Sequence, residues 1–284
     1  MVGELERIVV SGYRDNMTDD IGIGYFRSIG KRLREKIPGL RFSSTVQEPL
    51  ERGASGDKTF RMDRVAEDII LEALYNTGHP LTIISEEAGM IEIKGGGLRV
   101  LVDPVDGSKN AVTGIPMFCA SMALVDGDRV SGLKMSYIIN VLTGDEYWAV
   151  RGEGAFCNGR RLRTQGDDVM RVVLYETQNP GRDVPVILPL ISSATRARCF
   201  GSTALDLCFV AFGAASVYVN PAPSRSFDFA GGLLIVEEAG GVVTDIEGNS
   251  IEDVELSMKR VSPLLVSANG RLHGKALERL SEGR

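Results

Sequence analysis

The sequence is poor in the residues that build several common kinds of functional site. Only two histidines occur in 284 residues. Both, His79 and His273, lie in turn-like or terminal settings, so we expect neither to be catalytic. The four cysteines form no Cys-x-x-Cys pair, and each lies in or beside an apolar run. We therefore expect buried thiols in a reducing compartment rather than disulfides or a cysteine metal site.

Long apolar runs and basic clusters are also missing. No apolar stretch approaches the roughly 20 residues that span a membrane, and the first residues show no basic segment followed by an apolar one. The formal net charge is −6, and no run of lysine and arginine forms a basic arm. A nucleic-acid backbone attracts basic surfaces, so we expect no nucleic-acid partner. From the lack of long apolar runs, we expect a cytoplasmic protein without a membrane partner.

The residues that are abundant are those that form cores and turns. Hydrophobic residues make up 43% of the chain, and there are 33 glycines, so the chain can bury one large core or two modest ones. Apolar spacing predicts a helix over residues 17–36, a strand over 41–46 and an antiparallel meander over 118–150. Helices interspersed with parallel and antiparallel strands predict a layered α/β or α+β fold.

One apolar run ends abruptly in two carboxylates, Asp103 and Asp106. Pro104 stiffens the turn between them, and Gly107 permits a tight bend with close approach of a ligand. Ser108 adds a hydroxyl beside free backbone N–H groups. Carboxylates suit a hard cation and N–H groups suit an anion, so the stretch is typical of a metal-assisted phosphate site. Taken alone, it also fits an ordinary acidic turn.

A second buried strand, over residues 81–84, also runs into carboxylates, the first of which is Glu86. Open α/β sheets place ligands beyond the carboxyl ends of their strands. If the two strands are neighbours, Glu86 converges with Asp103 and Asp106. We expect residues 94–97, which read Lys-Gly-Gly-Gly, to form the turn between these strands.

A predicted helix that ends near residue 75 carries Asp63 and Glu67 in its first turns. Residues four apart share one flank of a helix, so both carboxyl groups point the same way. Acidic residues are favoured at helix starts. A solvated helix start therefore accounts for this pair without any further role.

Four separated segments together resemble the inositol monophosphatase and fructose-1,6-bisphosphatase superfamily of metal-dependent sugar phosphatases. In chain order they are Gly56-Asp57 with Asp63 and Glu67, Ser85-Glu86-Glu87-Ala88-Gly89, Asp103-Pro104-Val105-Asp106-Gly107-Ser108 with Asn110, and Phe227-Asp228 leading into Glu238-Ala239-Gly240-Gly241. One motif would be weak evidence, whereas four in the right order are specific. The resemblance covers most of the chain, and it implies a layered αβαβα sandwich, the sugar phosphatase fold, assembled as a homodimer.

The resemblance also implies a metal site. Two or three Mg²⁺ ions would be bound through oxygen ligands, as hard cations require. By position in the motifs, these ligands are Glu86, Asp103, Asp106, Asp228 and the carbonyl of Val105.

Other roles follow from the same resemblance. Asp63 and the Ser108 hydroxyl match the pair that orients and helps to deprotonate the attacking water. Backbone N–H groups of Gly107 and Ser108 would hold the phosphate. Glu67 would orient a ligand or a metal-bound water.

Two positions depart from the family's usual residues. Ser108 stands where threonine is usual, which keeps the hydroxyl but loses the methyl group that fixes its rotamer. Phe227 stands where tryptophan is usual, which keeps the packing but loses an N–H donor. Neither change removes a metal ligand, so we expect an active enzyme.

The resemblance also implies substrate contacts. Arg198, Thr203 and Arg225 match positions that contact substrate in archaeal-type bifunctional members, and Arg225 could pair bidentately with a second phosphate. The alternative for both arginines is surface solvation or an ion pair within the protein. Asn220 does not supply the acidic side chain with which inositol-specific members hold sugar hydroxyls.

We therefore expect one catalytic unit over residues 1–284, with sub-lobes over 1–165 and 166–284. The expected activity is Mg²⁺-dependent hydrolysis of fructose 1,6-bisphosphate and inositol 1-phosphate. Two alternatives remain open. A phosphatase for 3′-phosphoadenosine 5′-phosphate shares these motifs, and a non-catalytic, phosphate-sensing partner protein could keep the same fold.

Overall fold

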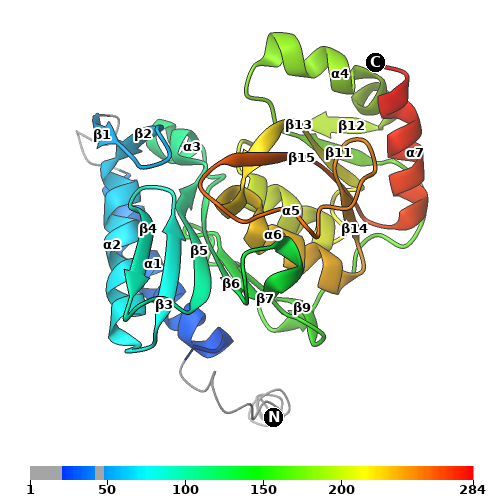
Figure 1. Ribbon diagram of the computed structural model, residues 1–284. Helices are drawn as coiled ribbons and strands as arrows, with labels where there is room; N and C mark the ends of the chain where they lie inside the picture. Colours follow the sequence, from blue (N-terminus) through cyan, green and yellow to red (C-terminus); the bar gives the residue numbers. More distant parts are fainter. Residues whose placement is uncertain (1–20, 42–47, 284) are drawn as a thin grey trace, which may run out of the picture.

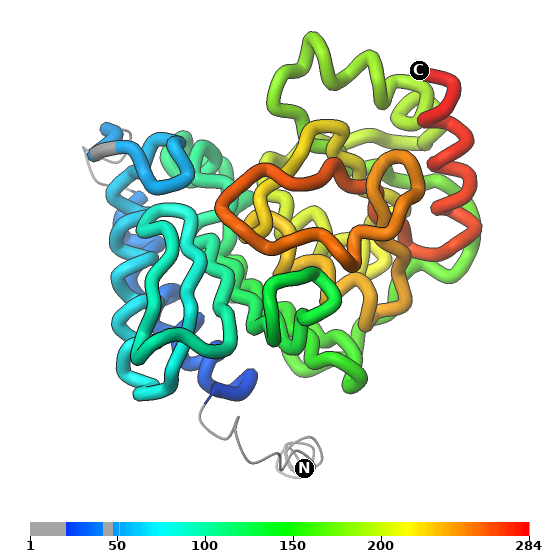
Figure 2. The backbone as a smooth tube through the Cα atoms, viewed as in Figure 1, coloured from blue at the N-terminus to red at the C-terminus, as the bar shows by residue number. Residues whose placement is uncertain are grey.

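The computed structural model describes residues 21–41 and 48–283 (Figures 1 and 2). The first residues of the predicted helix over 17–36 and nearly all of the predicted strand over 41–46 lie outside the described residues. Within them, helix α1 (Ile23–Leu40) continues beyond the predicted end and contains Pro38 in its last turn.

The described chain folds into five alternating layers of helices and strands (Figure 1). Two helices cover the outer face of a first sheet, two lie between this sheet and a second one, and two cover the outer face of the second sheet. In that order, the helices are α1 and α2 (Arg61–Asn76), α5 (Thr203–Ala211) and α6 (Ser226–Ala239), and α4 (Pro180–Ser193) and α7 (Gly270–Ser281). This arrangement confirms the predicted αβαβα sandwich.

The first sheet has eight strands in the order β10-β9-β8-β7-β6-β5-β3-β4. They are β3 (Leu81–Ser85), β4 (Gly89–Ile93), β5 (Leu98–Asp106), β6 (Cys119–Val125), β7 (Leu133–Ile139), β8 (Glu146–Val150), β9 (Gly154–Cys157) and β10 (Arg160–Arg161). Strands β3 and β5 are parallel neighbours, the arrangement on which the expected convergence of Glu86 with Asp103 and Asp106 depends. Strands β6, β7 and β8 form the predicted antiparallel meander.

The second sheet has five strands in the order β12-β11-β13-β15-β14. They are β11 (Val172–Tyr175), β12 (Arg196–Arg198), β13 (Val217–Arg225), β14 (Val242–Thr244) and β15 (Arg260–Ser267). A small hairpin of β1 (Pro49–Arg52) and β2 (Lys58–Phe60) precedes α2, and the short helix α3 (Ser108–Thr113) follows β5. The change from one sheet to the other falls between residues 161 and 172, near the predicted sub-lobe boundary. The described residues before and after this change are called the first and the second lobe below.

Helix α6 carries much of the contact between the layers. Most of its residues are buried, as in a helix that is surrounded by protein. A Cβ atom at Gly231 would lie 2.4 Å from Oγ of Ser121, and one at Gly232 would lie 2.5 Å from Cδ1 of Leu207. The two glycines therefore let α6 approach the first sheet and α5 closely.

Two expectations require correction. Strand β4 lies between β3 and β5 in the sequence and pairs antiparallel with β3, so residues 94–97 connect β4 to β5 instead of connecting the two parallel strands. Cys119, Cys157 and Cys208 are buried as predicted, but Cys199 is exposed. The reason is its place directly after β12, which lies at the edge of the second sheet.

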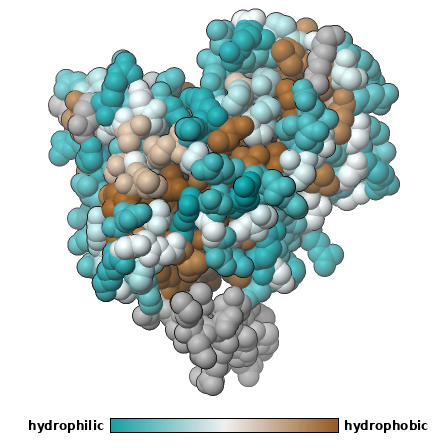
Figure 3. Space-filling model, in the orientation of Figure 1, coloured by the Kyte–Doolittle hydropathy of each residue, from teal (hydrophilic) through white to brown (hydrophobic). Residues whose placement is uncertain are grey.

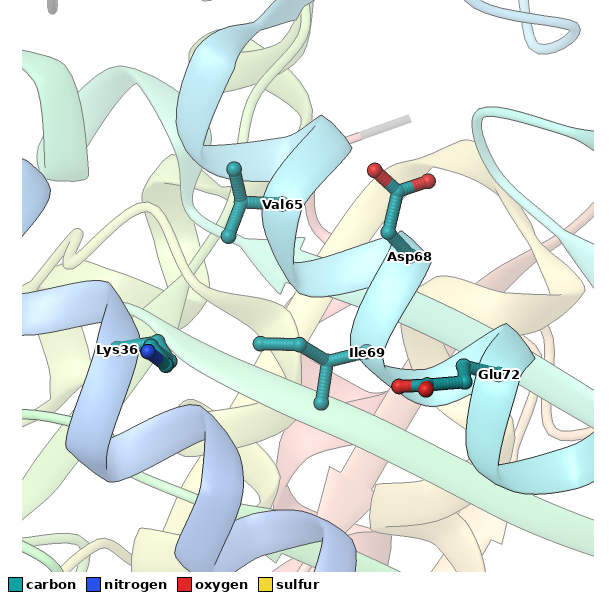
Figure 4. Close-up of a pocket in the computed structure, with 5 residues that line it drawn as sticks. All are labelled: Lys36, Val65, Asp68, Ile69 and Glu72. Carbon is teal, nitrogen blue, oxygen red and sulfur yellow. The ribbon is translucent and has the colours of Figure 1, made fainter. Parts of the chain in front are cut away.

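Two surface features complete the description. Among the described helices, none combines the length and the apolar character needed to cross a lipid bilayer. Helices α1 and α2 border a groove that contains none of the predicted site residues (Figure 4). Its lining consists of Lys36, Val65, Asp68, Ile69 and Glu72.

Candidate active site

The parallel pairing of β3 and β5 brings the first carboxylates together. Ser85 pairs with Val102, and the Glu86 N–H donates a hydrogen bond of 3.2 Å to the Val102 carbonyl. Glu86 therefore lies beside Asp103, the next residue of β5. Burial and neighbouring carboxylates raise the pKa of both residues well above the ordinary range. The sequence-based expectation that these strand ends converge is met by the geometry.

Asp106 is held by residues of the second lobe. Its Oδ2 accepts hydrogen bonds from the Ser202 hydroxyl at 2.6 Å and from the Ala204 N–H at 2.7 Å. These donors stabilise the charged form, yet burial prevails and raises the pKa of Asp106 to about 7. The N-terminus of α5 thus positions a carboxylate that the first sheet supplies.

Asp228 reaches the same place from the first turn of α6. Its Oδ2 accepts a hydrogen bond of 3.0 Å from the Arg225 N–H, which fixes the side chain against the helix start. Burial raises the pKa of Asp228 to about 6. The charge of Asp228 acts on Glu86, Asp103 and Asp106, so the two lobes contribute to one carboxylate cluster.

Asp63 and Ser108 are in direct contact. The Ser108 hydroxyl lies 2.9 Å from Oδ1 of Asp63 and 2.8 Å from the Val105 carbonyl oxygen, either of which can accept its proton. The other oxygen of Asp63 accepts a 2.7 Å hydrogen bond from the Phe60 N–H. Burial raises the pKa of Asp63 to about 7. The solvated helix start considered from the sequence is therefore wrong for Asp63, which is 1% exposed.

Glu67 joins α2 to the end of β3. It is fully buried, and its Oε1 accepts hydrogen bonds from the Ser85 hydroxyl at 2.6 Å and from the Ala88 N–H at 2.8 Å. These bonds hold the turn that carries Glu86.

Gly107 shapes the turn between Asp106 and Ser108. Its φ of 91° lies in the left-handed region that favours glycine. A Cβ atom there would lie 2.9 Å from the Met117 carbonyl oxygen and 3.1 Å from that of Gly201. The turn is therefore closed in on two sides by backbone that cannot easily move.

We expect Gly107→Ala to lower the melting temperature and to remove most of the activity, because it adds both backbone strain and a steric clash. Gly114→Ala is the matched control, since Gly114 has a similar φ of 87° but no heavy atom within 4 Å of the position that a Cβ atom would take. Left-handed strain alone costs about 1–3 kcal/mol. Thermal unfolding should show a larger loss for Gly107→Ala; equal losses would contradict a role for the close approach.

The residues of the carboxylate cluster fit a hard cation by their chemistry. The described residues contain no group of three or more Asp, Glu, His or Cys side chains already arranged to hold a metal ion. However, the charge of Asp228 raises the pKa values of Glu86 and Asp103, and the charge of Glu86 raises that of Asp103, in addition to the effect of burial. Such acids repel when ionised, and a cation among them would relieve that repulsion. The donor set therefore suits a hard cation better than a softer metal.

Two of the predicted substrate contacts, Thr203 and Arg198, make their hydrogen bonds away from the carboxylate cluster. Thr203 is buried, and its hydroxyl lies 3.0 Å from the Tyr218 hydroxyl. Arg198 is exposed and donates a hydrogen bond to the Ala197 carbonyl. Within the described residues, no hydrogen bond or ion pair connects Arg198 to the carboxylates. The structure thus brings neither side chain into the cluster.

Arg225 connects the second lobe to the β1–β2 hairpin. Its Nη1 lies 2.6 Å from Oδ2 of Asp57 and 3.7 Å from Oε1 of Glu86, and its Nη2 donates a 3.1 Å hydrogen bond to the Ser55 carbonyl. The side chain is only 9% exposed. The ion pair within the protein, which was the alternative interpretation of this arginine, is present.

Comparison with known proteins identifies the family of this chain. A profile described as the inositol monophosphatase family matches residues 18–283. The chain belongs to this family.

Individual inositol monophosphatase relatives match over most of their length. The fructose-1,6-bisphosphatase/inositol-1-monophosphatase of Methanothermobacter thermautotrophicus is 33% identical over 282 residues, which cover 92% of this chain and 99% of the relative. The Nus factor SuhB of Pseudomonas aeruginosa is 34% identical over 241 residues, 81% of this chain and 86% of the relative. A crystal structure of an inositol monophosphatase–fructose 1,6-bisphosphatase superposes with a TM-score of 0.79 at 26% identity, covering 90% and 98% of the two chains.

Membership in the inositol monophosphatase family makes this chain a phosphoric monoester hydrolase, the enzyme class that the motifs predict. Enzymes of the family are in general metal-dependent, which agrees with the chemistry of the carboxylate cluster.

Sequence reasoning missed several residues of this inositol monophosphatase site. Ser202 holds Asp106 directly, and the Asn110 amide donates hydrogen bonds to the carbonyls of Met117 at 2.7 Å and Phe200 at 2.6 Å. Glu87 is buried and accepts a hydrogen bond from Thr59. Asn110 and Glu87 lie within the quoted motifs and could have been singled out, whereas the role of Ser202 depends on contacts across the two lobes.

Proposed function

We propose that this chain is a Mg²⁺-dependent phosphomonoesterase that hydrolyses sugar phosphates, with inositol 1-phosphate and fructose 1,6-bisphosphate as its substrates. The observation that carries the proposal is the contact of Asp63, Ser108 and the Val105 carbonyl beside a buried carboxylate cluster. Archaeal relatives that are 33–36% identical have names with both activities, which supports this choice of substrates.

Asp63 and Ser108 are proposed to handle the proton of the attacking water. A general base works best when its pKa lies near the working pH, and the pKa of Asp63 is about 7. The Ser108 hydroxyl can donate to Asp63 while its oxygen accepts a proton from water. The Val105 carbonyl oxygen, 2.8 Å away, is the alternative acceptor for the single proton of this hydroxyl.

Glu86, Asp103, Asp106, Asp228 and the Val105 carbonyl are the proposed ligands of two or three Mg²⁺ ions. When bound, the metal would lower the pKa of the attacking water and neutralise charge on the phosphate. The backbone N–H groups of Gly107 and Ser108 are the proposed phosphate donors, because the left-handed turn at Gly107 leaves the start of α3 free of side chain.

Arg225 is proposed to contact the second phosphate of fructose 1,6-bisphosphate only after its ion pair with Asp57 opens. The pair is partly exposed on the Asp57 side, with 60% of that side chain accessible. A phosphate carries more charge than a carboxylate and accepts the same bidentate hydrogen bonds. Arg198 and Thr203 remain proposed substrate contacts on the strength of the resemblance alone.

The experiment that tests the proposal measures phosphate release from inositol 1-phosphate, fructose 1,6-bisphosphate and 3′-phosphoadenosine 5′-phosphate with the same purified protein. We expect release from both sugar phosphates at a higher kcat/KM than from the nucleotide. Preference for the nucleotide would establish the first alternative. Folded protein that releases no phosphate from any of them would favour a partner-protein role, which the similarity to the Nus factor SuhB keeps open.

Homodimeric assembly and a cytoplasmic location are further proposals that rest on the resemblance. Figure 3 shows hydrophobic residues gathered over the β3–β4 hairpin, on a part of the first sheet that α6 leaves uncovered. Met90, in β4, is 66% exposed. An uncovered apolar patch of this kind is typical of a protein–protein interface.

A further inference from the structure

One carboxylate faces the site from the second sheet and has no role in the account above. Glu176 is the first residue after β11, and its N–H donates a 3.0 Å hydrogen bond to the Val219 carbonyl of β13. The parallel pairing of Tyr175 with Val219 continues to this point. Glu176 therefore lies at the same sheet edge as Asn220, where ligands of α/β proteins bind.

The side chain of Glu176 lies within reach of the cluster's charges. Asp106 and Asp228 interact electrostatically with it, and so does Lys109, which lies in α3 on the opposite lobe. Glu176 is half-buried. The neighbouring acid Asp206 is 0% exposed and thus out of reach of a substrate. Glu176 is therefore partly accessible and lies near charges that both lobes supply.

One oxygen of Glu176 is free to accept hydrogen bonds. Oε1 accepts a 2.9 Å bond from the Thr177 N–H, which fixes the direction of the carboxylate. Among the hydrogen bonds of residues 21–41 and 48–283, none ends on Oε2. A fixed carboxylate with one unused oxygen is preorganised to bind a donor from a ligand.

The other polar side chains on this wall are already engaged. The Asn220 amide accepts from the Ala222 N–H and donates to the Ser224 hydroxyl, at 3.0 and 2.9 Å. The Thr203 hydroxyl is bonded to that of Tyr218, and Arg225 is paired with Asp57. Of these described side chains, Glu176 is the one with an oxygen atom, Oε2, that takes part in no hydrogen bond within the protein.

We propose that Glu176 is a specificity-determining residue that accepts hydrogen bonds from hydroxyl groups of the substrate's carbon skeleton. This inference rests on the proposed function. The phosphate would bind at Gly107 and Ser108 on the first lobe, so the remainder of the substrate extends toward the second lobe and meets Glu176. A carboxylate accepts well from hydroxyl groups. The part of a sugar phosphate that Glu176 selects is therefore its hydroxyl-bearing carbon skeleton.

The test compares a polyol substrate with one that lacks hydroxyl groups. Glu176→Ala and Glu176→Gln are assayed with inositol 1-phosphate and with p-nitrophenyl phosphate, with kcat and KM determined separately. Glu153→Ala, which removes an exposed carboxylate on the β8–β9 turn, is the matched control.

For Glu176→Ala, we expect the KM for inositol 1-phosphate to rise about tenfold or more, with kcat/KM for p-nitrophenyl phosphate changed by less than about twofold. The KM of Glu176→Gln for inositol 1-phosphate should lie between those of the wild type and Glu176→Ala, because the glutamine amide oxygen still accepts hydrogen bonds. Equal losses on both substrates, or no loss on either, would overturn the inference and leave the proposed function intact. Wild-type protein that hydrolyses p-nitrophenyl phosphate but not inositol 1-phosphate would instead contradict the proposed function, and the inference with it.

Discussion

Asp106→Asn should abolish nearly all phosphatase activity while the protein stays folded. The substitution keeps the size of the side chain, and the amide oxygen can still accept from the Ala204 N–H. It removes a negative charge from the proposed metal site, where carboxylate ligands supply most of the affinity for Mg²⁺. We expect kcat/KM to fall by at least about 10³-fold, an effect typical of lost electrostatic stabilisation in an active site.

An exposed carboxylate elsewhere in the protein provides the control for Asp106→Asn. Asp168→Asn removes an exposed carboxylate that pairs with Lys275 at 2.8 Å, and it should leave activity unchanged. Calorimetric titration with Mg²⁺ should show weaker or fewer binding events for Asp106→Asn alone. Near-normal turnover or unchanged Mg²⁺ binding in this variant would refute the assignment of Asp106 as a ligand.

The metal-free protein should become less stable as the pH rises from 5 to 8. Burial raises the pKa values of Asp63 and Asp106 to about 7 and that of Asp228 to about 6, whereas in the unfolded chain all three titrate near 3.8. Between these values the folded state binds more protons than the unfolded state, so the stability contribution is complete below pH 4 and is lost as the pH approaches 7.

His273 acts in the opposite direction, because burial lowers its pKa and folding then favours its neutral form at higher pH. One histidine opposes at least three carboxyl groups, so the net change is a loss. We expect the melting temperature to fall by at least about 3 °C, which corresponds to roughly 1 kcal/mol for a protein of this size.

Two comparisons isolate the origin of this pH dependence. Mg²⁺ should raise the melting temperature more at pH 8 than at pH 5, because it binds ionised carboxylates and competes with protons. Asp63→Asn should be less sensitive to pH than the wild type, whereas Asp168→Asn should not differ from it. A metal-free protein whose melting temperature rises steadily from pH 5 to 8 would contradict the buried carboxylate cluster.

The parts of the site that follow strand ends could be predicted from the sequence. Glu86 and Asp103 come directly after apolar runs, and parallel strands bring such positions together at one sheet edge. A tight bend at Gly107 also follows from the sequence, because glycine permits one directly after a carboxylate, and the structure forms it with a left-handed residue. The local sequence pattern is sufficient to predict those parts of the site whose geometry depends on one pair of neighbouring strands.

Contacts between the lobes could not be predicted in this way. The hydrogen bond from Ser202 to Asp106 joins residues far apart in the chain, and no periodicity relates them. The ion pair of Arg225 with Asp57 is a similar case: the sequence left both an internal pair and a substrate contact open. The exposure of Cys199 depends on the edge position of β12, which only the sheet order reveals.

The most direct test of the central claim is phosphate release from inositol 1-phosphate by protein dialysed against a chelator, before and after Mg²⁺ is added back. The account predicts no release above background without Mg²⁺, and restored turnover that saturates with Mg²⁺ in the wild type but not in Asp106→Asn. Undiminished release from the metal-free protein would show that the carboxylate cluster does not work through a cation and would contradict the account.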